Sequence, residues 1–219
     1  MTKYPKISVI IPAYNHEKYI GRCLRSVFDQ SINEEDYEII VINDASKDNT
    51  KEIISKFLNK IVYMENKINS GLPYSLNKGI KKAKGKYIVR LDSDDYVNHD
   101  FLLILYLFLN QNINFDAVSC DYIIVDDNEK VIKREDSQKK PIGCAIMFKT
   151  DDLIKIGLYN KNFRLHEDKE LMERFKKHFN VTRIPLPLYR YRQHSKNITS
   201  NVKNDKFYKS KLKNEKKKH

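Results

Sequence analysis

The residues best suited to chemistry follow the apolar run Tyr87-Ile88-Val89-Arg90-Leu91, where three of the next four residues are Asp92, Asp94 and Asp95. If the run is a buried strand, Asp92 and Asp94 project from one face, because alternate residues of a strand share a face. Carboxylates crowded in this way repel each other, and a hard divalent cation that carries an anionic ligand relieves the repulsion. The cluster is equally typical of an acidic turn before a helix, here one that begins near Asn98.

Two more polar segments follow apolar runs that are typical of buried strands. Pro12-Ala13-Tyr14-Asn15 comes after Ile7 to Ile11, and Asp44 comes after Glu38 to Ile42. In open α/β sheets, ligands bind beyond the carboxyl ends of the strands. We therefore expect these segments and the acidic cluster to converge on one site. The Pro and Tyr after the first strand disfavour the glycine-rich loops of dinucleotide-binding and P-loop proteins.

Apolar spacing predicts the elements that must position these residues. In the first half, strands at 7–11, 38–42, 61–64 and 86–91 alternate with helices at 17–30, from 48, at 72–84 and at 100–111. This alternation predicts an α/β fold, with a mostly parallel central sheet and helices on both faces. Strands at 117–125, 130–134, 142–149 and 181–184 and a helix at 167–179 predict a smaller antiparallel addition in the second half.

The length of 219 residues fits one domain with one substantial core. Much of the net charge of +12 comes from the lysine-rich end, which we interpret as a disordered basic tail. The three cysteines stand singly without the spacing of a metal site, which favours reduced thiols and a cytoplasmic protein. No run reaches the length of a transmembrane helix, and the N-terminus lacks the pattern of a secretion signal.

The ordered motifs resemble those of family 2 glycosyltransferases, which have the Rossmann-like GT-A fold. The resemblance rests on segments in chain order: Ser8 to Asn15, Val41 to Thr50, Asn69-Ser70-Gly71-Leu72 with Asn77-Lys78-Gly79-Ile80, Leu91 to Asp95, His166-Glu167-Asp168, and Tyr189 to His194. It implies one GT-A domain at 1–200, with a nucleotide-binding half at 1–112 and an acceptor half at 113–200, followed by the tail at 201–219.

The resemblance also implies roles for single residues. Pro12, Ala13 and Tyr14 match the nucleobase pocket, where the aromatic ring stacks on a uracil, although a core aromatic is the alternative for Tyr14. Asp44 matches the carboxylate that accepts a hydrogen bond from the base, while a turn or helix cap is its structural alternative.

Asp92 and Ser93 match positions that contact the donor, with Asp92 facing the ribose. Asp94 matches the ligand of a Mg²⁺ or Mn²⁺ ion that bridges to the donor diphosphate, and His194 matches a candidate ligand of the same metal. Asp168 matches the general base that takes a proton from the acceptor hydroxyl. Its structural alternative is an acid in the first turn of a helix.

These roles predict an inverting, metal-dependent transferase that moves a sugar from a nucleotide donor, a UDP-sugar, to a hydroxyl of a glycan or lipid-linked glycan. The lack of Trp and of membrane spans disfavours a processive synthase. Two alternatives stay open at this point: a nucleotidyltransferase on a similar fold, and a non-enzymatic, basic nucleic-acid-binding protein. We expect a cytoplasmic enzyme without a nucleic-acid partner, whose basic tail is a candidate peripheral contact with an anionic membrane.

Overall fold

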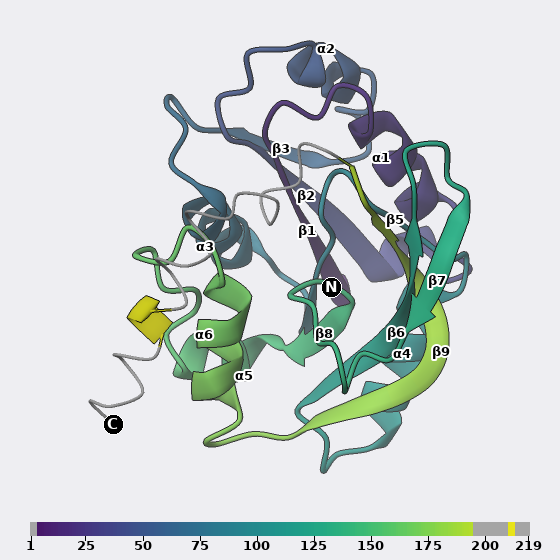
Figure 1. The fold of residues 1–219 in the computed structure, drawn as a ribbon, viewed down its shortest axis with the longest axis vertical. Coiled ribbons are helices and arrows are strands. Elements are labelled where there is room, and N and C mark those ends of the chain that lie inside the picture. The colour runs from purple at the N-terminus through teal and green to yellow at the C-terminus, as the bar shows by residue number, and fades with distance from the viewer. Residues whose placement is uncertain (1–3, 195–209, 213–219) are drawn as a thin grey trace.

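The computed structural model describes residues 4–194 and 210–212. Its elements, drawn in Figure 1, are β1 (Ile7–Ala13), α1 (Ile20–Phe28), η1 (Glu34–Asp36), β2 (Tyr37–Asn43), α2 (Thr50–Ser55), β3 (Val62–Glu65), α3 (Leu72–Lys82), β4 (Tyr87–Arg90), β5 (Tyr96–Val97), α4 (Phe101–Gln111), β6 (Ala117–Val125), β7 (Val131–Glu135), β8 (Ile146–Lys149), α5 (Thr150–Lys155), α6 (Glu167–Phe175) and β9 (Val181–Arg192).

Within the described ranges, nine strands form one sheet in the order β3-β2-β1-β4-β8-β6-β9-β5, with β7 paired to β6. β1, β2, β3 and β4 pair in parallel, as do β6 and β9. β8 lies antiparallel between β4 and β6, and β5 and β7 also pair antiparallel. The predicted α/β fold, with a parallel core and a smaller antiparallel addition, is confirmed.

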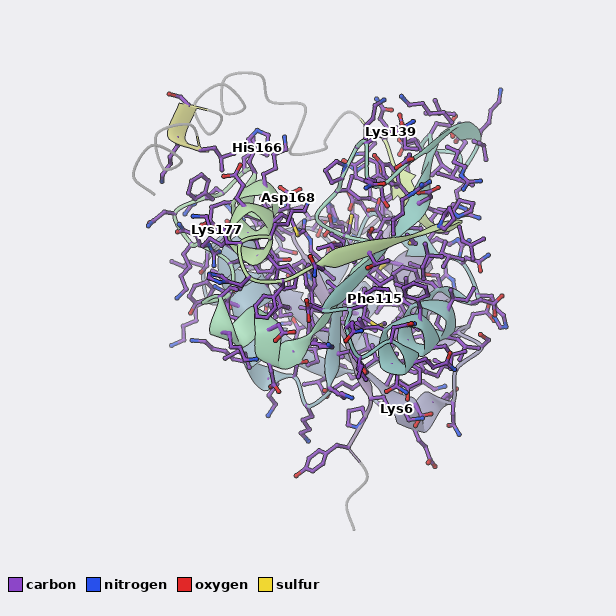
Figure 2. All side chains as sticks on the ribbon, turned by 90° about the horizontal axis from the view of Figure 1, so that it is seen from below. Lys6, Phe115, Lys139, His166, Asp168 and Lys177 are labelled. Atoms are coloured by element: carbon purple, nitrogen blue, oxygen red, sulfur yellow. The ribbon has the colours of Figure 1, made fainter. Side chains whose placement is uncertain are left out.

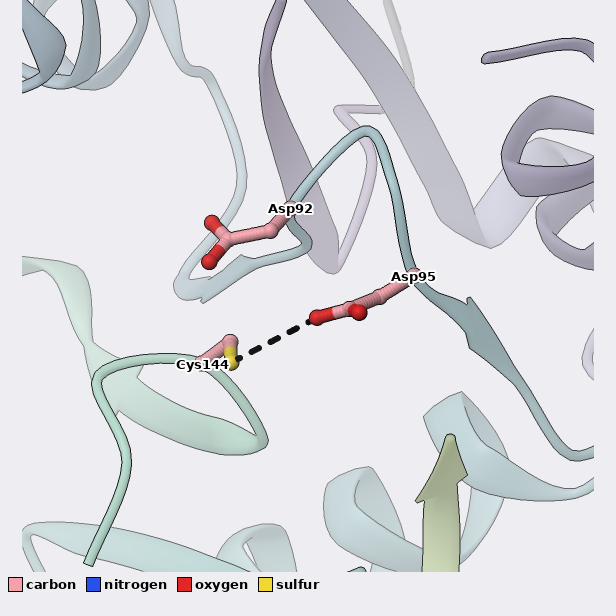
Figure 3. Close-up of side chains that lie close together, drawn as sticks. All are labelled: Asp92, Asp95 and Cys144. Carbon is pink, nitrogen blue, oxygen red and sulfur yellow. Dashed lines mark hydrogen bonds between the residues drawn. The ribbon is translucent and has the colours of Figure 1, made fainter. Parts of the chain in front are cut away.

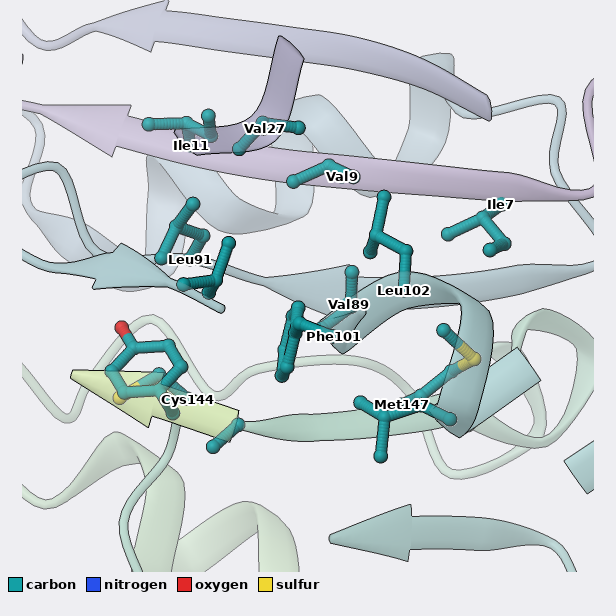
Figure 4. Close-up of a cluster of buried hydrophobic side chains, with 14 of the residues drawn as sticks. Ile7, Val9, Ile11, Val27, Val89, Leu91, Phe101, Leu102, Cys144 and Met147 are labelled. Atoms are coloured by element: carbon teal, nitrogen blue, oxygen red, sulfur yellow. The ribbon is translucent and has the colours of Figure 1, made fainter. Parts of the chain in front are cut away.

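The alternation of side chains along β1 separates two hydrophobic cores. Ile7, Val9 and Ile11 face the core that contains the buried sides of α1 and α4, and Figure 4 shows part of this cluster. Ile10 points to the other face, where α3, α5 and α6 pack. A Cβ at Gly79 would lie 2.7 Å from the Ile10 side chain, so α3 approaches the sheet closely only because this residue is glycine.

The first-half elements match the predicted ones to within a few residues, whereas several second-half predictions were wrong. β8 begins at Ile146, because the preceding residues form a loop that packs on α6. β9 extends to Arg192, far beyond the predicted end at Ile184, because it pairs with β6 on one side and with β5 on the other. The short elements β5 and α5 were not predicted, and α6 ends at Phe175.

Most of the predicted basic tail lies outside the described residues. Residues 210–212 form a helical turn in which Leu212 is buried, and Lys211 Nζ donates to the carbonyl of Asn162 at 2.8 Å. In the described parts of the chain, no helix combines the length and the apolar character that a membrane crossing requires.

Candidate active site

The carboxyl ends of β1, β2 and β4 meet, and the polar segments that follow them are hydrogen-bonded to one another. The Asp44 amide donates to the Ala13 carbonyl at 2.8 Å, which joins the ends of β1 and β2. His16 Nδ1 lies 2.6 Å from Ser93 Oγ, which joins the loop after β1 to the acidic turn after β4. The three clusters that the sequence places at strand ends therefore share one edge of the sheet.

Asp44 organises the loop that leads into α3. Its Oδ1 accepts hydrogen bonds from Asn66 Nδ2 at 2.7 Å and from the Ser70 amide at 2.9 Å, and its Oδ2 accepts one from the Gly71 amide at 2.8 Å. The carboxylate itself is buried. Asp44 thus draws the Asn69-Ser70-Gly71 motif to the end of β2. It does not cap α2, where Asp48 accepts the Thr50 amide instead.

The residues at the end of β1 differ in how far they are exposed to solvent. Pro12 and Ala13 are buried in the strand, while Tyr14 directly after it is 38% exposed. Tyr14 is therefore not the core aromatic that was its structural alternative. Because Tyr14 directly follows the end of β1 and is exposed, its ring is available for a flat ligand to stack on.

Asp92 is held by a buried arginine at the end of β4. Arg90 Nε donates to Asp92 Oδ1 at 2.6 Å and Arg90 Nη2 donates to Asp92 Oδ2 at 3.0 Å. The remaining arm of the same guanidinium, Nη1, donates to Glu167 Oε1 at 2.8 Å. Such a fork between two carboxylates is a use for which arginine geometry is well suited. Arg90 therefore ties the acidic turn to the first turn of α6.

Asp168 follows Glu167 in this first turn, and Figure 2 shows it at the end of α6 that carries His166. A Cβ at Gly143 would lie 2.5 Å from Asp168 Cβ and 3.0 Å from Arg90 Nη1. The loop before β8 therefore packs directly on the acidic end of α6. Burial raises the pKa of Glu167 to about 7, with Asp168 adding to the shift and Arg90 opposing it.

Asp94 has a different partner from Asp92. Its Oδ2 lies 3.0 Å from His194 Nε2, and the imidazole stacks on the Tyr19 ring with a centroid distance of 4.8 Å. Although burial opposes the charge, the hydrogen bond from His194 and the nearby His16 hold the pKa of Asp94 below its usual value. A carboxylate oxygen and an imidazole nitrogen side by side are a donor set that Mg²⁺ or Mn²⁺ accepts.

The expectation that Asp92 and Asp94 share a strand face was wrong, because β4 ends at Arg90 and the next residues form a turn. This turn closes with a hydrogen bond from the Asp95 amide to the Asp92 carbonyl at 3.0 Å. As a result, the two carboxylates reach different partners on either side of the turn.

A second group of donor atoms lies beneath the turn. One ligand atom each from Asp92, Asp95 and Cys144 falls within 4.8 Å of the others (Figure 3). Asp95, however, already accepts the Tyr189 hydroxyl and the Arg192 amide, both at 2.7 Å. Burial together with neighbouring carboxylates holds the pKa of the Cys144 thiol well above its usual value, which disfavours a thiolate ligand. Asp94 and His194 fit a metal better.

Sequence reasoning missed several residues of this site. Arg90 interrupts an apolar run directly before the acidic turn, and this lone charge in a buried strand was the available signal. His16 and Tyr19 carried no comparable signal. Arg192 was not missed, because it belongs to the Tyr189 to His194 segment that carries the resemblance. It is buried and donates to the Asp94 carbonyl at 2.9 Å and to Glu129 Oε1 at 3.0 Å, so it fixes the turn in place.

Residues 8–163 match the profile of Glycosyl transferase family 2. The chain belongs to this family. The match spans the ends of β1, β2 and β4, and hence the shared edge described above. The resemblance inferred from the motifs is thereby confirmed.

The curated relatives of this family 2 chain include other glycosyltransferases. It is 43% identical over 111 residues to a poly(ribitol-phosphate) beta-glucosyltransferase of Bacillus spizizenii, a match that covers 49% of this chain and 18% of that protein. It is 31% identical over 229 residues to an uncharacterized glycosyltransferase of Haemophilus influenzae, with 93% of this chain and 70% of that protein covered. The chain therefore spans only about a fifth of the length of the first relative.

Solved structures share its fold. The Staphylococcus aureus TarS fragment 1–349 in complex with UDP-GlcNAc matches with a TM-score of 0.79 at 23% identity, covering 90% of this chain and 61% of that one. The mannosyltransferase PcManGT of Pyrobaculum calidifontis, in complex with GDP-Man and Mn²⁺, matches with a TM-score of 0.70 at 16% identity, covering 90% and 59%. These likenesses establish the GT-A fold of this family 2 chain.

Proposed function

We propose that this chain is a metal-dependent, inverting glycosyltransferase that moves a sugar from a UDP-sugar to a hydroxyl of a glycan or lipid-linked glycan. The observation that carries the proposal is the Arg90 fork, which connects the turn bearing Asp94 to the helix end bearing Asp168. A site of this kind offers a metal-ligating side chain and a basic carboxylate at one edge of the sheet. Transfer from a nucleoside diphosphate sugar needs both.

The donor binds at the ends of β1, β2 and β4 in this proposal. The exposed Tyr14 ring stacks on the nucleobase, with Pro12 and Ala13 as its support. Asp44 orders the 66–71 loop that borders the base, while Asp92 and Ser93 lie toward the ribose. Support for a UDP-sugar comes from the TarS structures, which hold UDP and UDP-GlcNAc, although the chain shares only their fold.

Asp94 and His194 are the proposed metal ligands, for Mn²⁺ or Mg²⁺. When bound, the ion neutralises the charge that develops on the departing diphosphate. Support comes from the adjacent carboxylate and imidazole and from the Mn²⁺ in the complex of PcManGT. On the protein's side, Arg192 and Tyr19 hold the two ligands in place, through the Asp94 carbonyl and the His194 ring.

Asp168 is the proposed general base. It takes the proton from the acceptor hydroxyl as that oxygen attacks the anomeric carbon, and attack opposite the leaving diphosphate inverts the configuration. Asp168 stands in the first turn of α6, at the N-terminal end of the helix. Arg90 keeps the adjacent Glu167 in place, so the base is attached to a fixed helix end.

The two alternative functions are not favoured. A nucleotidyltransferase and a nucleic-acid-binding protein both lack support from the family match, which covers residues 8–163. We propose a cytoplasmic site of action, and the basic segment 201–219 remains a candidate contact with anionic lipid. Deletion of residues 202–219 tests that contact, because it should reduce sedimentation with acidic vesicles.

A donor screen followed by turnover tests the function. We expect UDP to raise the melting temperature more in the presence of Mn²⁺ than in its absence, and a UDP-sugar to release UDP when an acceptor is present. Release of pyrophosphate from a nucleoside triphosphate would instead indicate a nucleotidyltransferase. Absence of any nucleotide-induced shift, together with salt-sensitive binding of RNA, would indicate a nucleic-acid-binding protein.

A further inference from the structure

His16 lies between two parts of the proposed donor site, and the proposed function gives it no role. It follows the exposed Tyr14 by two residues, and its ring meets the His194 ring edge to face at a centroid distance of 6.3 Å. Tyr14 is the proposed contact of the nucleobase, and His194 is the proposed metal ligand beside the diphosphate. A nucleotide that reaches from one to the other therefore passes His16.

The loop that carries His16 is held by its own hydrogen bonds. The His16 amide donates to Thr50 Oγ1 at 2.8 Å. The His16 carbonyl accepts the amides of Tyr19 at 3.0 Å and of Ile20 at 2.9 Å, which start α1. The imidazole also packs edge to face on the Tyr19 ring, with a centroid distance of 6.0 Å. The side chain is thus in place before a ligand binds, so a contact made through it costs little conformational entropy.

The buried Ser93 decides which nitrogen of the His16 ring carries the proton. His16 Nδ1 lies 2.6 Å from Ser93 Oγ, and Ser93 is 1% exposed. In the described parts of the chain, this hydroxyl has no other hydrogen-bond partner. Because a buried hydroxyl that finds no acceptor is costly, Ser93 donates to Nδ1. The neutral imidazole then carries its proton on Nε2.

The Nε2–H group of His16 is a donor that the protein leaves open. None of residues 4–194 and 210–212 accepts a hydrogen bond from it. The ring is half-buried, and since Nδ1 points to the buried Ser93, Nε2 points away from the interior of the acidic turn. A protonated nitrogen has no lone pair for a metal, but it suits an anionic oxygen.

We propose that His16 Nε2–H donates a hydrogen bond to a phosphate oxygen of the nucleoside diphosphate donor, beside the metal held by Asp94 and His194. The inference rests on the proposed function and adds a contact within the same site. The contact favours a nucleoside diphosphate over the bare nucleoside, which has no phosphate oxygen to accept the bond.

Two variants separate the two nitrogens of His16. The His16→Asn side chain ends at the level of Nδ1, so its amide oxygen can still accept the Ser93 hydroxyl, but it has no group at the level of Nε2. The His16→Gln side chain ends one bond further and places an amide N–H at the level of Nε2. A contact made through Nε2 should therefore survive in His16→Gln and be lost in His16→Asn.

Calorimetric titration of the full chain with UDP in the presence of Mn²⁺ tests the contact, with uridine as the control ligand without phosphate. We expect His16→Asn to weaken UDP binding about tenfold, as for loss of one hydrogen bond to a charged group, and to leave uridine binding and the melting temperature unchanged. His16→Gln should stay within about threefold of wild type. His178→Asn, at an exposed histidine after α6, is the matched control and should bind UDP as wild type does.

His16→Phe keeps the ring contacts with Tyr19 and His194 but has no nitrogen, so it should repeat the loss seen in His16→Asn. Wild-type affinity for UDP in both variants would overturn the proposal. So would a loss in His16→Gln as large as in His16→Asn, or an equal loss for uridine and UDP. In these cases wild type still binds UDP, and the proposed function stands. A wild-type chain that binds no UDP would overturn the proposed donor and this contact together.

Discussion

The acidic turn carries two carboxylates, Asp92 and Asp94, whose partners differ in kind. Asp92 receives two hydrogen bonds from the buried Arg90 guanidinium, which stays charged at every physiological pH. Asp94 faces His194, whose imidazole nitrogen is itself a common type of metal ligand. Asp92 is thus paired with a permanent cation of the protein. Asp94 instead lies beside an imidazole, and the two side chains can bind one metal ion together.

Within one short turn, this difference gives Asp92 a structural role and leaves Asp94 as the candidate metal ligand. A metal at Asp92 would have to displace a buried guanidinium and leave Glu167 without its partner, at a large cost in free energy. A metal at Asp94 adds to a donor pair that is already in place. The comparison therefore predicts that changes on the Arg90 side affect mainly stability, while changes on the His194 side affect mainly activity.

Replacement of Arg90 should have the largest effect on folding. Arg90→Met removes the cation that pairs with the half-buried Asp92 and the buried Glu167, so we expect the free energy of unfolding to fall by about 3–5 kcal/mol. Urea denaturation measures the change. His194→Gln serves as the matched control and should cost about 1 kcal/mol or less. Equal losses in the two variants would remove the distinction between the sides of the turn.

Asp94→Asn should have the largest effect on activity. We expect transfer to fall about a thousandfold, or ~4 kcal/mol in transition-state stabilisation, because an amide is a poor ligand for the ion that neutralises the diphosphate. Release of UDP from the donor measures the rate, and the melting temperature should change little. Mn²⁺-independent activity in wild type and variant alike would refute the role of Asp94.

Asp168→Asn should lower transfer by a hundredfold or more, as expected for removal of a general base. Binding of UDP, measured by calorimetry, should stay unchanged, since the proposed role of Asp168 is toward the acceptor hydroxyl and not toward the nucleotide. A variant that transfers sugar at the wild-type rate would exclude the assigned role.

The pH dependence of the free energy of unfolding should reveal the raised pKa of Glu167. Its pKa is raised from 4.5 to about 7 in the folded protein, so between these values the folded state holds a proton that the unfolded chain has released. The free energy of unfolding should therefore fall as the pH rises through this window, by about 3 kcal/mol. Glu167→Gln should lack this component. If the stability curves of wild type and variant run parallel from pH 4.5 to 7, the buried carboxyl does not titrate as described.

The parts of the fold that sequence predicts well are those whose signal is local. β1, β2 and α4 have apolar patterns that identify them without knowledge of their neighbours. The extension of β9 to Arg192 could not be predicted in this way, because it depends on pairing with β6 and β5.

The same limit applies to the site. The motifs predict Asp94 and Asp168 as site residues, but no sequence pattern predicts that Arg90 reaches Glu167, which is 77 positions away. The separate partners of Asp92 and Asp94 follow from the end of β4 one residue earlier than the predicted strand end at 91. A single residue in a strand boundary decides which way a side chain points.

Anomalous diffraction at the manganese edge, from crystals grown with UDP and Mn²⁺, tests the central claim most directly. The account predicts a peak within bonding distance of the Asp94 carboxylate and close to His194, on the opposite side of the turn from Arg90. A peak among Asp92, Asp95 and Cys144 would contradict it, because the metal would then occupy the side that the protein already neutralises.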